Sequence, residues 1–98
     1  LATGSCTIAS GSDIGGSIRI PAAACGVFGF KPPYGRNPEV PYGNLDYYSH
    51  SGPMARSVED IILMQSLTAG INNQDIASLT KPNDFDGNYN LKNLKILI

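Results

Sequence analysis

The chain of 98 residues lacks tryptophan, has one histidine and two cysteines, and carries charge on only 15% of its residues. Cys6 and Cys25 are too few for a disulfide framework, and their spacing fits no common metal motif. The seven Lys and Arg residues are scattered and nearly balanced by eight acidic residues, which argues against nucleic acid or an anionic membrane as the main partner. No apolar run approaches the roughly 20 residues that span a bilayer, and residues 1–10 do not resemble a signal peptide. We therefore expect a cytoplasmic protein with reduced cysteines.

Hydrophobic residues make up 42% of the chain, which is typical of a globular domain. Residues 5–10 (SCTIAS) place two β-branched residues between glycines and predict a buried strand. Residues 22–30 (AAACGVFGF) favour a short helix that becomes extended at Val27, with two phenylalanines expected in the core. Residues 94–98 (LKILI) predict the start of another strand. Strands mixed with helices indicate an α/β fold.

The clearest predicted helix covers residues 57–69. Ser57 can cap its N-terminus, and Asp60 lies near the positive end of the helix dipole. Gly70 is expected to end the helix. The expected apolar face of this helix consists of Val58, Ile61, Ile62, Met64 and Leu67.

Two segments without regular structure are expected on either side of this helix. Residues 31–56 begin with a stretch rich in proline and glycine, which predicts a long surface loop. Residues 71–90 are polar and rich in Asn and Asp, which predicts a linker. Long loops in compact proteins are often functional.

Residues 11–21 (GSDIGGSIRIP) form the most distinctive stretch, because a glycine pair immediately precedes Ser17. Gly15 and Gly16 have no β-carbon, so the backbone there can approach a ligand closely and its N–H groups can form a nest for negative charge. If the Ser17 hydroxyl attacks a carbonyl, these amides can stabilise the oxyanion. An ordinary turn and a phosphate cradle are the alternatives. The glycine and lysine spacing of a P-loop is absent, which weakens the hypothesis that this loop binds phosphate.

Longer stretches carry a family resemblance. Residues 11–36 and 49–70 contain, in order, Asp-x-Gly-Gly-Ser-x-Arg-x-Pro, Cys-Gly, Lys-Pro-x-Tyr-Gly and Gly-Pro-Met-Ala-Arg. This order closely resembles the amidase signature family of serine amide hydrolases. The match runs over residues 2–70 and returns weakly at 91–98. The resemblance implies a mixed β-sheet core flanked by helices, of which residues 1–98 form a part.

The resemblance also implies roles for particular residues. Ser17 matches the acylated nucleophile, while Asp13 and Arg19 match motif positions that we expect to order the loop. No metal or organic cofactor is implied. The backbone N–H groups that match the oxyanion hole are those of Ile14, Gly15, Gly16 and Ser17.

The family's mechanism requires two more groups, a lysine base and a serine with a cis peptide bond that relays the proton. In the family's pattern both lie upstream of Leu1, so neither is assigned to this chain. We therefore expect the chain to be a fragment of a larger amidase and to be inactive alone. A serine hydroxyl is a poor nucleophile without an adjacent base.

Two residues within the chain are rival candidates for the base. Lys31 is one, although the family has a lysine at this point without using it as the base. His50 is the other, and a triad of Ser17, His50 and Asp46 is conceivable. We expect Cys25 to have only a packing role.

Three functions follow from these observations. The first is hydrolysis of a non-peptide carboxamide through an acyl-enzyme on Ser17, with a small-molecule amide as substrate. The second is an amidotransferase A-type subunit that releases ammonia from glutamine and works with partner subunits. The third is a non-catalytic, truncated remnant of the fold. A homo-oligomer is compatible with the first, and none of the three requires direct contact with nucleic acid or a membrane.

Overall fold

The computed structural model describes residues 1–39 and 46–78. Its elements lie in the order strand, helix, two strands, helix and a single 3-10 turn. They are β1 (Ile8–Asp13), α1 (Arg19–Cys25), β2 (Phe28–Gly29), β3 (His50–Ala55), α2 (Val58–Thr68) and η2 (Ile76–Ser78).

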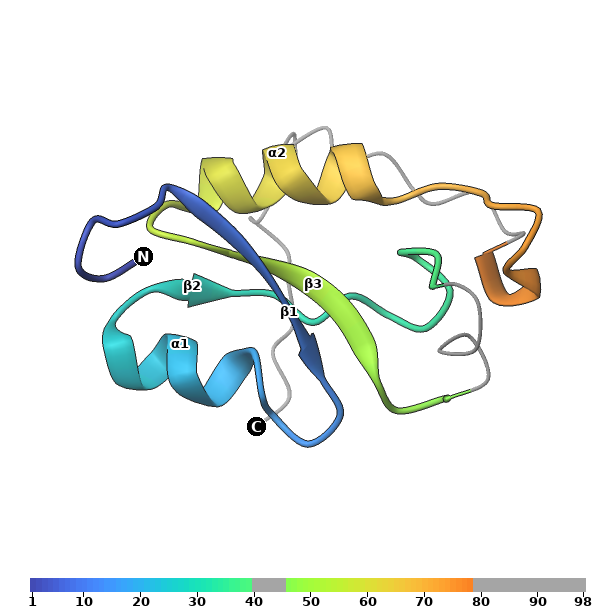
Figure 1. Cartoon of the computed structure of the whole chain (residues 1–98), viewed down its shortest axis with the longest axis horizontal. Coiled ribbons are helices and arrows are strands. Elements are labelled where there is room, and N and C mark those ends of the chain that lie inside the picture. Colours follow the sequence, from blue (N-terminus) through green and yellow to red (C-terminus); the bar gives the residue numbers. More distant parts are fainter. Residues whose placement is uncertain (40–45, 79–98) are drawn as a thin grey trace, which may run out of the picture.

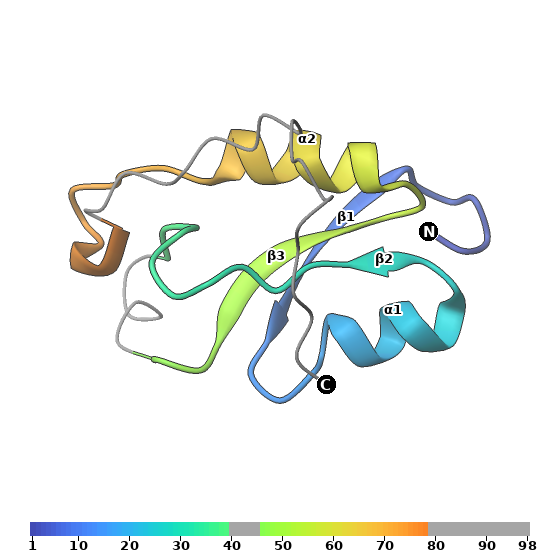
Figure 2. The same ribbon diagram turned by 180° about the vertical axis from the view of Figure 1, so that it is seen from behind.

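The three strands form one antiparallel sheet in the order β1-β3-β2 (Figure 1). In the β1 and β3 pair, Ile8 lies opposite Ala55 and Asp13 lies opposite His50. The short β2 begins with Phe28 opposite Ala55. Helix α2 covers one face of the sheet and α1 lies on the other side, as the views from front and back agree (Figures 1 and 2). The predicted α/β class is therefore confirmed.

The central strand β3 corrects the prediction of a loop over residues 31–56, because 50–55 are a strand. The loop prediction rested on the prolines and glycines that begin this segment, and Gly52 and Pro53 add no strand signal, since glycine and proline are depleted in strands. In the structure, Pro53 is buried and its carbonyl accepts a hydrogen bond from the Phe30 N–H at 3.0 Å. A β-carbon on Gly52 would collide with the Phe30 carbonyl oxygen. The glycine permits close packing here.

Strand β1 and helix α1 both extend into residues 11–21, which the sequence assigned to a loop. The strand runs over Ile8–Asp13 instead of 5–10, and most of its side chains are partly or fully exposed. The helix begins at Arg19. Proline is tolerated in a first helical turn, which explains how Pro21 lies inside α1. The connecting segment is therefore only 14–18.

Ile18 fixes this short connection to the sheet. Its side chain is 0% exposed. It packs where three glycines leave room, because β-carbons on Gly11, Gly29 and Gly52 would lie 3.3, 3.0 and 3.4 Å from its side-chain carbons. Burying one large aliphatic side chain contributes roughly 1.5–3 kcal/mol. Ser17 is thus the immediate neighbour of a well-anchored residue.

Helix α2 occupies nearly the predicted range. The Ser57 hydroxyl caps it by accepting a hydrogen bond from the Asp60 N–H at 3.2 Å. Ala69, in an extended conformation, ends it, so the predicted glycine stop at Gly70 is wrong. Of the predicted apolar face only Ile61 is buried, and Leu67 is 78% exposed.

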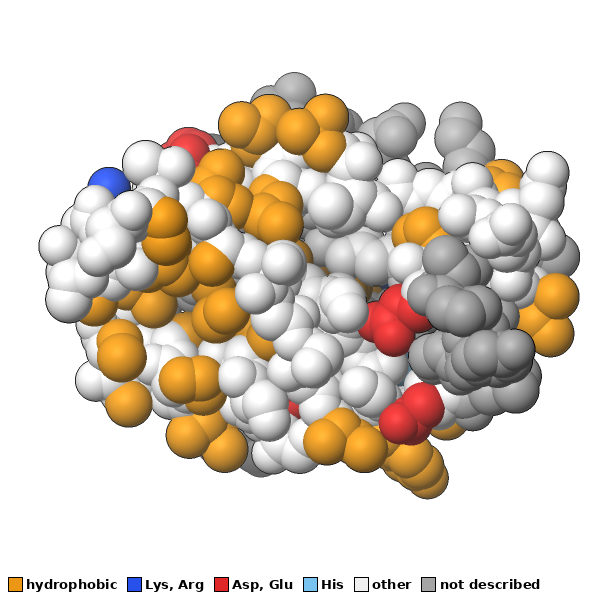
Figure 3. Space-filling model, in the orientation of Figure 1, with side chains coloured by type: hydrophobic (Ala, Val, Ile, Leu, Met, Phe, Trp, Pro, Cys, Tyr) orange, Lys and Arg blue, Asp and Glu red, His pale blue; other side chains and the backbone are white. Residues whose placement is uncertain are grey.

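Several other apolar residues are also more exposed than predicted. Phe28 is 48% exposed and Cys25 lies at the surface, so neither belongs to a core. Apolar side chains spread over the face that carries α2, β2 and α1 (Figure 3). Phe28 lies in the two-residue edge strand β2 and Cys25 is the last residue of α1, so each is at the margin of its element.

The predicted linker over residues 71–90 is partly folded. Ser78, the last residue of η2, and Asp75, which immediately precedes this 3-10 turn, are both buried. The Asp75 carboxylate accepts hydrogen bonds from the N–H groups of Glu39 and Ala77, which attaches this turn to the segment before β3. The remainder of the predicted linker, 79–90, and the predicted strand over 94–98 lie outside the described residues.

Candidate functional site

The carboxylate of Asp13, at the end of β1, organises the connection to α1. The side chain is 0% exposed. Its oxygens accept hydrogen bonds from three backbone amides, those of Gly16 at 2.6 Å and of Ile18 and Arg19 at 3.2 Å each. The Arg19 guanidinium adds a bidentate contact, with Nε at 2.9 Å and Nη2 at 3.1 Å. One buried group therefore holds most of the loop.

The same contacts determine the charge of the site. The hydrogen bond from the Arg19 side chain is the largest cause that lowers the pKa of Asp13 well below its usual range. Burial acts in the opposite direction, while the backbone amides of Arg19, Gly16 and Ile18 lower the pKa further. Asp13 in turn raises the pKa of Arg19. Asp13 is therefore a fixed negative charge at neutral pH.

Lys31, at the exit of β2, contacts the other side of the loop. Its Nζ donates to the carbonyl oxygens of Ile14 at 3.2 Å and Tyr48 at 2.6 Å. It also lies 3.6 Å from Asp13 Oδ1. The sequence drew attention to Lys31 only as a rival base and gave no sign of these contacts, because they join segments 17 residues apart on each side.

The backbone amides of the loop divide into two groups. The Gly16 N–H is bound to Asp13, so the structure does not support its predicted place in an oxyanion hole. The N–H groups of Ile14, Gly15 and Ser17 donate no hydrogen bond within residues 1–39 and 46–78. Ser17 itself is exposed. The loop thus presents a serine hydroxyl and three unbonded amides.

The two glycines of the pair differ in their conformation. Gly16 has φ +122°, and a β-carbon there would lie 2.5 Å from Ile20 Cδ1. Gly15 has no positive φ, and a β-carbon on it would meet nothing within 4 Å. Only the second glycine of the pair is required by the backbone.

This difference gives a matched pair of variants. Gly16→Ala should lower the free energy of unfolding by roughly 2 kcal/mol or more, because it combines a disfavoured φ with overpacking. Gly15→Ala should change it by less than about 0.5 kcal/mol, as expected of a substitution without contacts. Urea unfolding of the two variants and of the wild type measures these two changes in the free energy of unfolding. Equal destabilisation would show that the loop does not hold this conformation.

The conceivable triad is not assembled. Asp46 Oδ1 accepts hydrogen bonds from the N–H groups of Tyr48 and Ser49, which closes a local turn. The His50 ring lies against Tyr34, with ring centroids 5.6 Å apart. In the described part of the chain, no hydrogen bond joins Ser17, His50 and Asp46.

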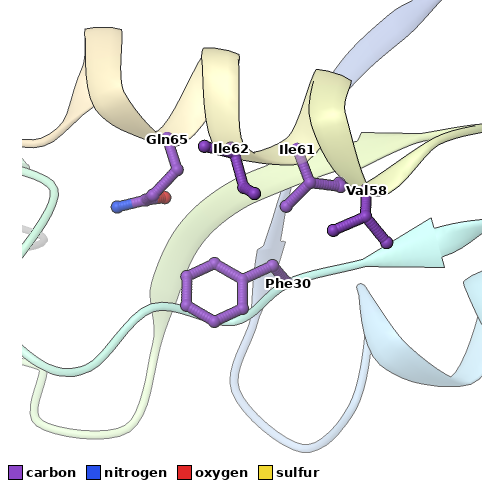
Figure 4. A pocket seen from close by; sticks show the side chains of 5 residues that line it. All are labelled: Phe30, Val58, Ile61, Ile62 and Gln65. Carbon is purple, nitrogen blue, oxygen red and sulfur yellow. The ribbon is translucent and has the colours of Figure 1, made fainter. Parts of the chain in front are cut away.

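An apolar cavity of about 180 Å³ lies between α2 and the segment after β2 (Figure 4). Its lining consists of Phe30, Val58, Ile61, Ile62 and Gln65. The only polar group among them is the Gln65 amide, which is paired with that of Asn37. This cavity shares no residue with the segment 14–18 that connects β1 to α1, hereafter the Gly-Gly-Ser loop, and it offers no nucleophile.

The described ranges hold neither of two other kinds of site. No three His, Cys, Asp or Glu side chains gather there as a metal-binding set. None of the helices in those ranges has the length and apolar character needed to cross a bilayer. The Gly-Gly-Ser loop is the candidate site because it presents an exposed Ser17 on a backbone held by Asp13.

Known proteins resemble the chain over nearly its whole length. The A-type subunit of the glutamyl-tRNA(Gln) amidotransferase of Deinococcus radiodurans is 44% identical over 101 aligned residues, covering 98% of this chain and 20% of the relative. The corresponding protein of Thermus thermophilus is 47% identical over 88 residues, covering 87% and 18%. The chain thus spans about a fifth of the length of these curated relatives.

Solved structures give the same result. A bacterial aryl acylamidase of the amidase signature enzymes superimposes with a TM-score of 0.77 at 38% identity, over 88% of this chain and 18% of that protein. A chain of a vestigial protein complex described as revealing the evolutionary origins of an s-triazine catabolic enzyme, in its inhibitor-bound form, gives 0.74 at 36% identity, over 82% and 18%. The family model described as Amidase matches residues 1–97. This chain belongs to the amidase signature family.

Proposed function

We propose that the chain is the nucleophile-bearing segment of an amidase, which cleaves a carboxamide through an acyl-enzyme on Ser17. The parent enzyme is the longer protein that contains this segment. The observation that carries the proposal is that Ser17 is exposed on a loop whose shape is fixed by Asp13. The neighbouring backbone N–H groups of Ile14 and Gly15 make no hydrogen bond within the described residues. Small-molecule amides are the proposed substrate class.

The proposed chemistry needs only the groups of a serine hydrolase. The Ser17 oxygen attacks the carbonyl carbon, and the carbonyl oxygen takes the negative charge. The amides of Ile14, Gly15 and Ser17 stabilise this oxyanion, and loss of one such donor typically costs about 3 kcal/mol. The C–N bond then breaks, the leaving nitrogen takes a proton, and water hydrolyses the ester to release the acid.

The base that takes the Ser17 proton is proposed to lie in the rest of the parent enzyme. The resemblance implies a lysine and a relay serine with a cis peptide bond, both upstream of residue 1. Lys31 fits the role poorly, because its Nζ already donates to the carbonyls of Ile14 and Tyr48. His50 also fits poorly, because its ring packs on Tyr34.

A second candidate is an amidotransferase A-type subunit, in which the carboxamide is the side chain of glutamine. The curated relatives from Deinococcus and Thermus carry this name, which favours it. The acyl transfer on Ser17 would be the same, but the ammonia would pass to an acceptor held by partner subunits. Glutamine-dependent transfer by a complex of the parent with such subunits would distinguish the two. Hydrolysis of simple amides by the parent alone favours the amidase.

A fluorophosphonate probe tests the proposal directly. We expect the parent enzyme to be labelled, with the adduct located at Ser17 by mass spectrometry. Ser17→Ala should abolish the labelling, whereas His50→Ala should retain at least about half of it, because within residues 1–39 and 46–78 no hydrogen bond links His50 to Ser17. An adduct on another residue would refute the assignment of Ser17. Absence of labelling in a folded parent would favour the non-catalytic remnant.

A further inference from the structure

Two carbonyl groups of the Gly-Gly-Ser loop accept hydrogen bonds, although most of its amides donate none within the described residues. The Ile14 carbonyl accepts a hydrogen bond from Lys31 Nζ at 3.2 Å. The Gly16 carbonyl accepts one from the Ile20 N–H at 2.7 Å. These two contacts have a consequence for the amides that follow, because each carbonyl shares a peptide unit with the next N–H.

A trans peptide unit is planar, and its C=O and N–H point in opposite directions. With the Ile14 carbonyl directed at Lys31, the Gly15 N–H must point away from Lys31. With the Gly16 carbonyl directed at α1, the Ser17 N–H must point away from that helix. The peptide unit between Gly15 and Gly16 is oriented by its N–H rather than by its carbonyl, because the Gly16 N–H is bound to Asp13. All three peptide units from Ile14 to Ser17 are thus fixed.

The Lys31 ammonium is suited to hold one of these units. It has three N–H donors. Its oxygen neighbours are the carbonyls of Ile14 and Tyr48 and, at 3.6 Å, Asp13 Oδ1. These atoms come from the loop, from the end of β1 and from the segment before β3. The Lys31 side chain is 18% exposed, whereas Ile14 and Tyr48, whose carbonyls it binds, are exposed residues.

We propose that Lys31 is a positioning residue, which orients the Gly15 N–H toward the oxyanion by holding the Ile14 carbonyl. This inference rests on the proposed function, because it assumes that Gly15 serves the Ser17 reaction. It assigns Lys31 a role other than that of a base. It also links the segment containing Tyr48 to the nucleophile loop through one ammonium group.

Kinetics of the parent enzyme test the proposal with Lys31→Met and Lys31→Arg. Lys31→Met keeps the length of the side chain but removes its donors. We expect kcat for a small amide to fall about 10- to 100-fold with KM changed less than about threefold, because one oxyanion donor is misdirected. Affinity for a boronic acid that forms a tetrahedral adduct with serine should fall by a similar factor. A purely structural role would leave both values unchanged per folded molecule.

Lys31→Arg separates positioning from base catalysis. Arginine donates to carbonyls but cannot give up its proton in a protein. We expect kcat of the Lys31→Arg variant to be at least about tenfold higher than kcat of the Lys31→Met variant. Equal inactivity of both variants would overturn the proposal and favour a base.

A crystal structure of the parent carrying Lys31→Met gives a readout independent of activity. We expect the peptide between Ile14 and Gly15 to rotate, so that the Gly15 N–H leaves its position, while Asp13 still binds Gly16. An unrotated peptide would overturn the positioning role whatever the kinetics. A rotated peptide in a parent that hydrolyses no amide would leave the positioning of Gly15 intact and refute the proposed function.

Discussion

The 98 residues alone should hydrolyse amides at least about 10⁴-fold more slowly than the parent enzyme. Removing the base from a serine hydrolase costs several orders of magnitude in rate, since the hydroxyl is then not activated. The described residues offer no replacement. Lys31 Nζ is engaged by the carbonyls of Ile14 and Tyr48, and His50 makes no hydrogen bond to Ser17 in the described part of the chain.

The measurement is kcat/KM for one amide substrate, compared between the chain and the parent. Ser17→Ala in both proteins gives the background rate. Exposed apolar residues such as Leu67 favour association of the isolated chain, so circular dichroism and light scattering must first establish a folded monomer. Rates within tenfold of each other would place the base inside these residues. The Lys31→Arg and His50→Ala variants would then locate it.

Elements encoded by local signals could be predicted from the sequence. The start of α2 follows from Ser57, whose hydroxyl accepts the Asp60 N–H as the capping pattern requires. The extended conformation after α1 follows from Gly26, which adopts a left-handed φ of +64° at the C-terminus of that helix. Such signals act within a few residues, and no tertiary contact is needed to interpret them.

The central strand could not be predicted, because the reasons for its composition are tertiary. Gly52 faces the Phe30 backbone, and in the neighbouring strand β1 Gly11 makes room for Ile18. In the sequence both glycines suggest turns, whereas in the structure both permit close approach between elements. The exposed face of α2 is a similar case. An apolar stripe on a helix shows that the helix requires a partner surface. It does not show whether that surface belongs to the same 98 residues.

The candidate site shows the same division. The motif identified the loop and drew attention to Asp13 and Arg19, which make a bidentate contact. It did not reveal that Asp13 occupies the Gly16 amide. Nor did it reveal that Lys31 holds the Ile14 carbonyl. Which backbone groups remain unbonded depends on the direction of each peptide unit, and a sequence pattern does not encode these directions.

Asp13→Asn should reduce kcat/KM of the parent enzyme about 10²- to 10³-fold, the second large effect that we expect. The carboxylate accepts hydrogen bonds from the amides of Gly16, Ile18 and Arg19 and from the Arg19 side chain. An amide side chain places an NH₂ group where one acceptor was and leaves Arg19 without its counter-charge. The loop then loses the geometry that orients its unbonded amides, at a cost similar to loss of an oxyanion donor. Asp60→Asn is the matched control, since the capping contact of this residue is made by its backbone N–H, which the substitution keeps.

The pH dependence of stability gives Asp13→Asn a second readout. The pKa of Asp13 is lowered in the folded state, chiefly by the Arg19 side chain, below the ordinary value of about 4. Between the two pKa values the unfolded chain binds more protons, so the stabilisation by Asp13 is fully present above about pH 4 and declines as the pH falls further. The difference in Tm between wild type and Asp13→Asn should therefore be constant from pH 7 to about 5 and shrink from about pH 4 toward pH 2. A difference that persists unchanged to pH 2 would mean that the charge of Asp13 does not hold the loop.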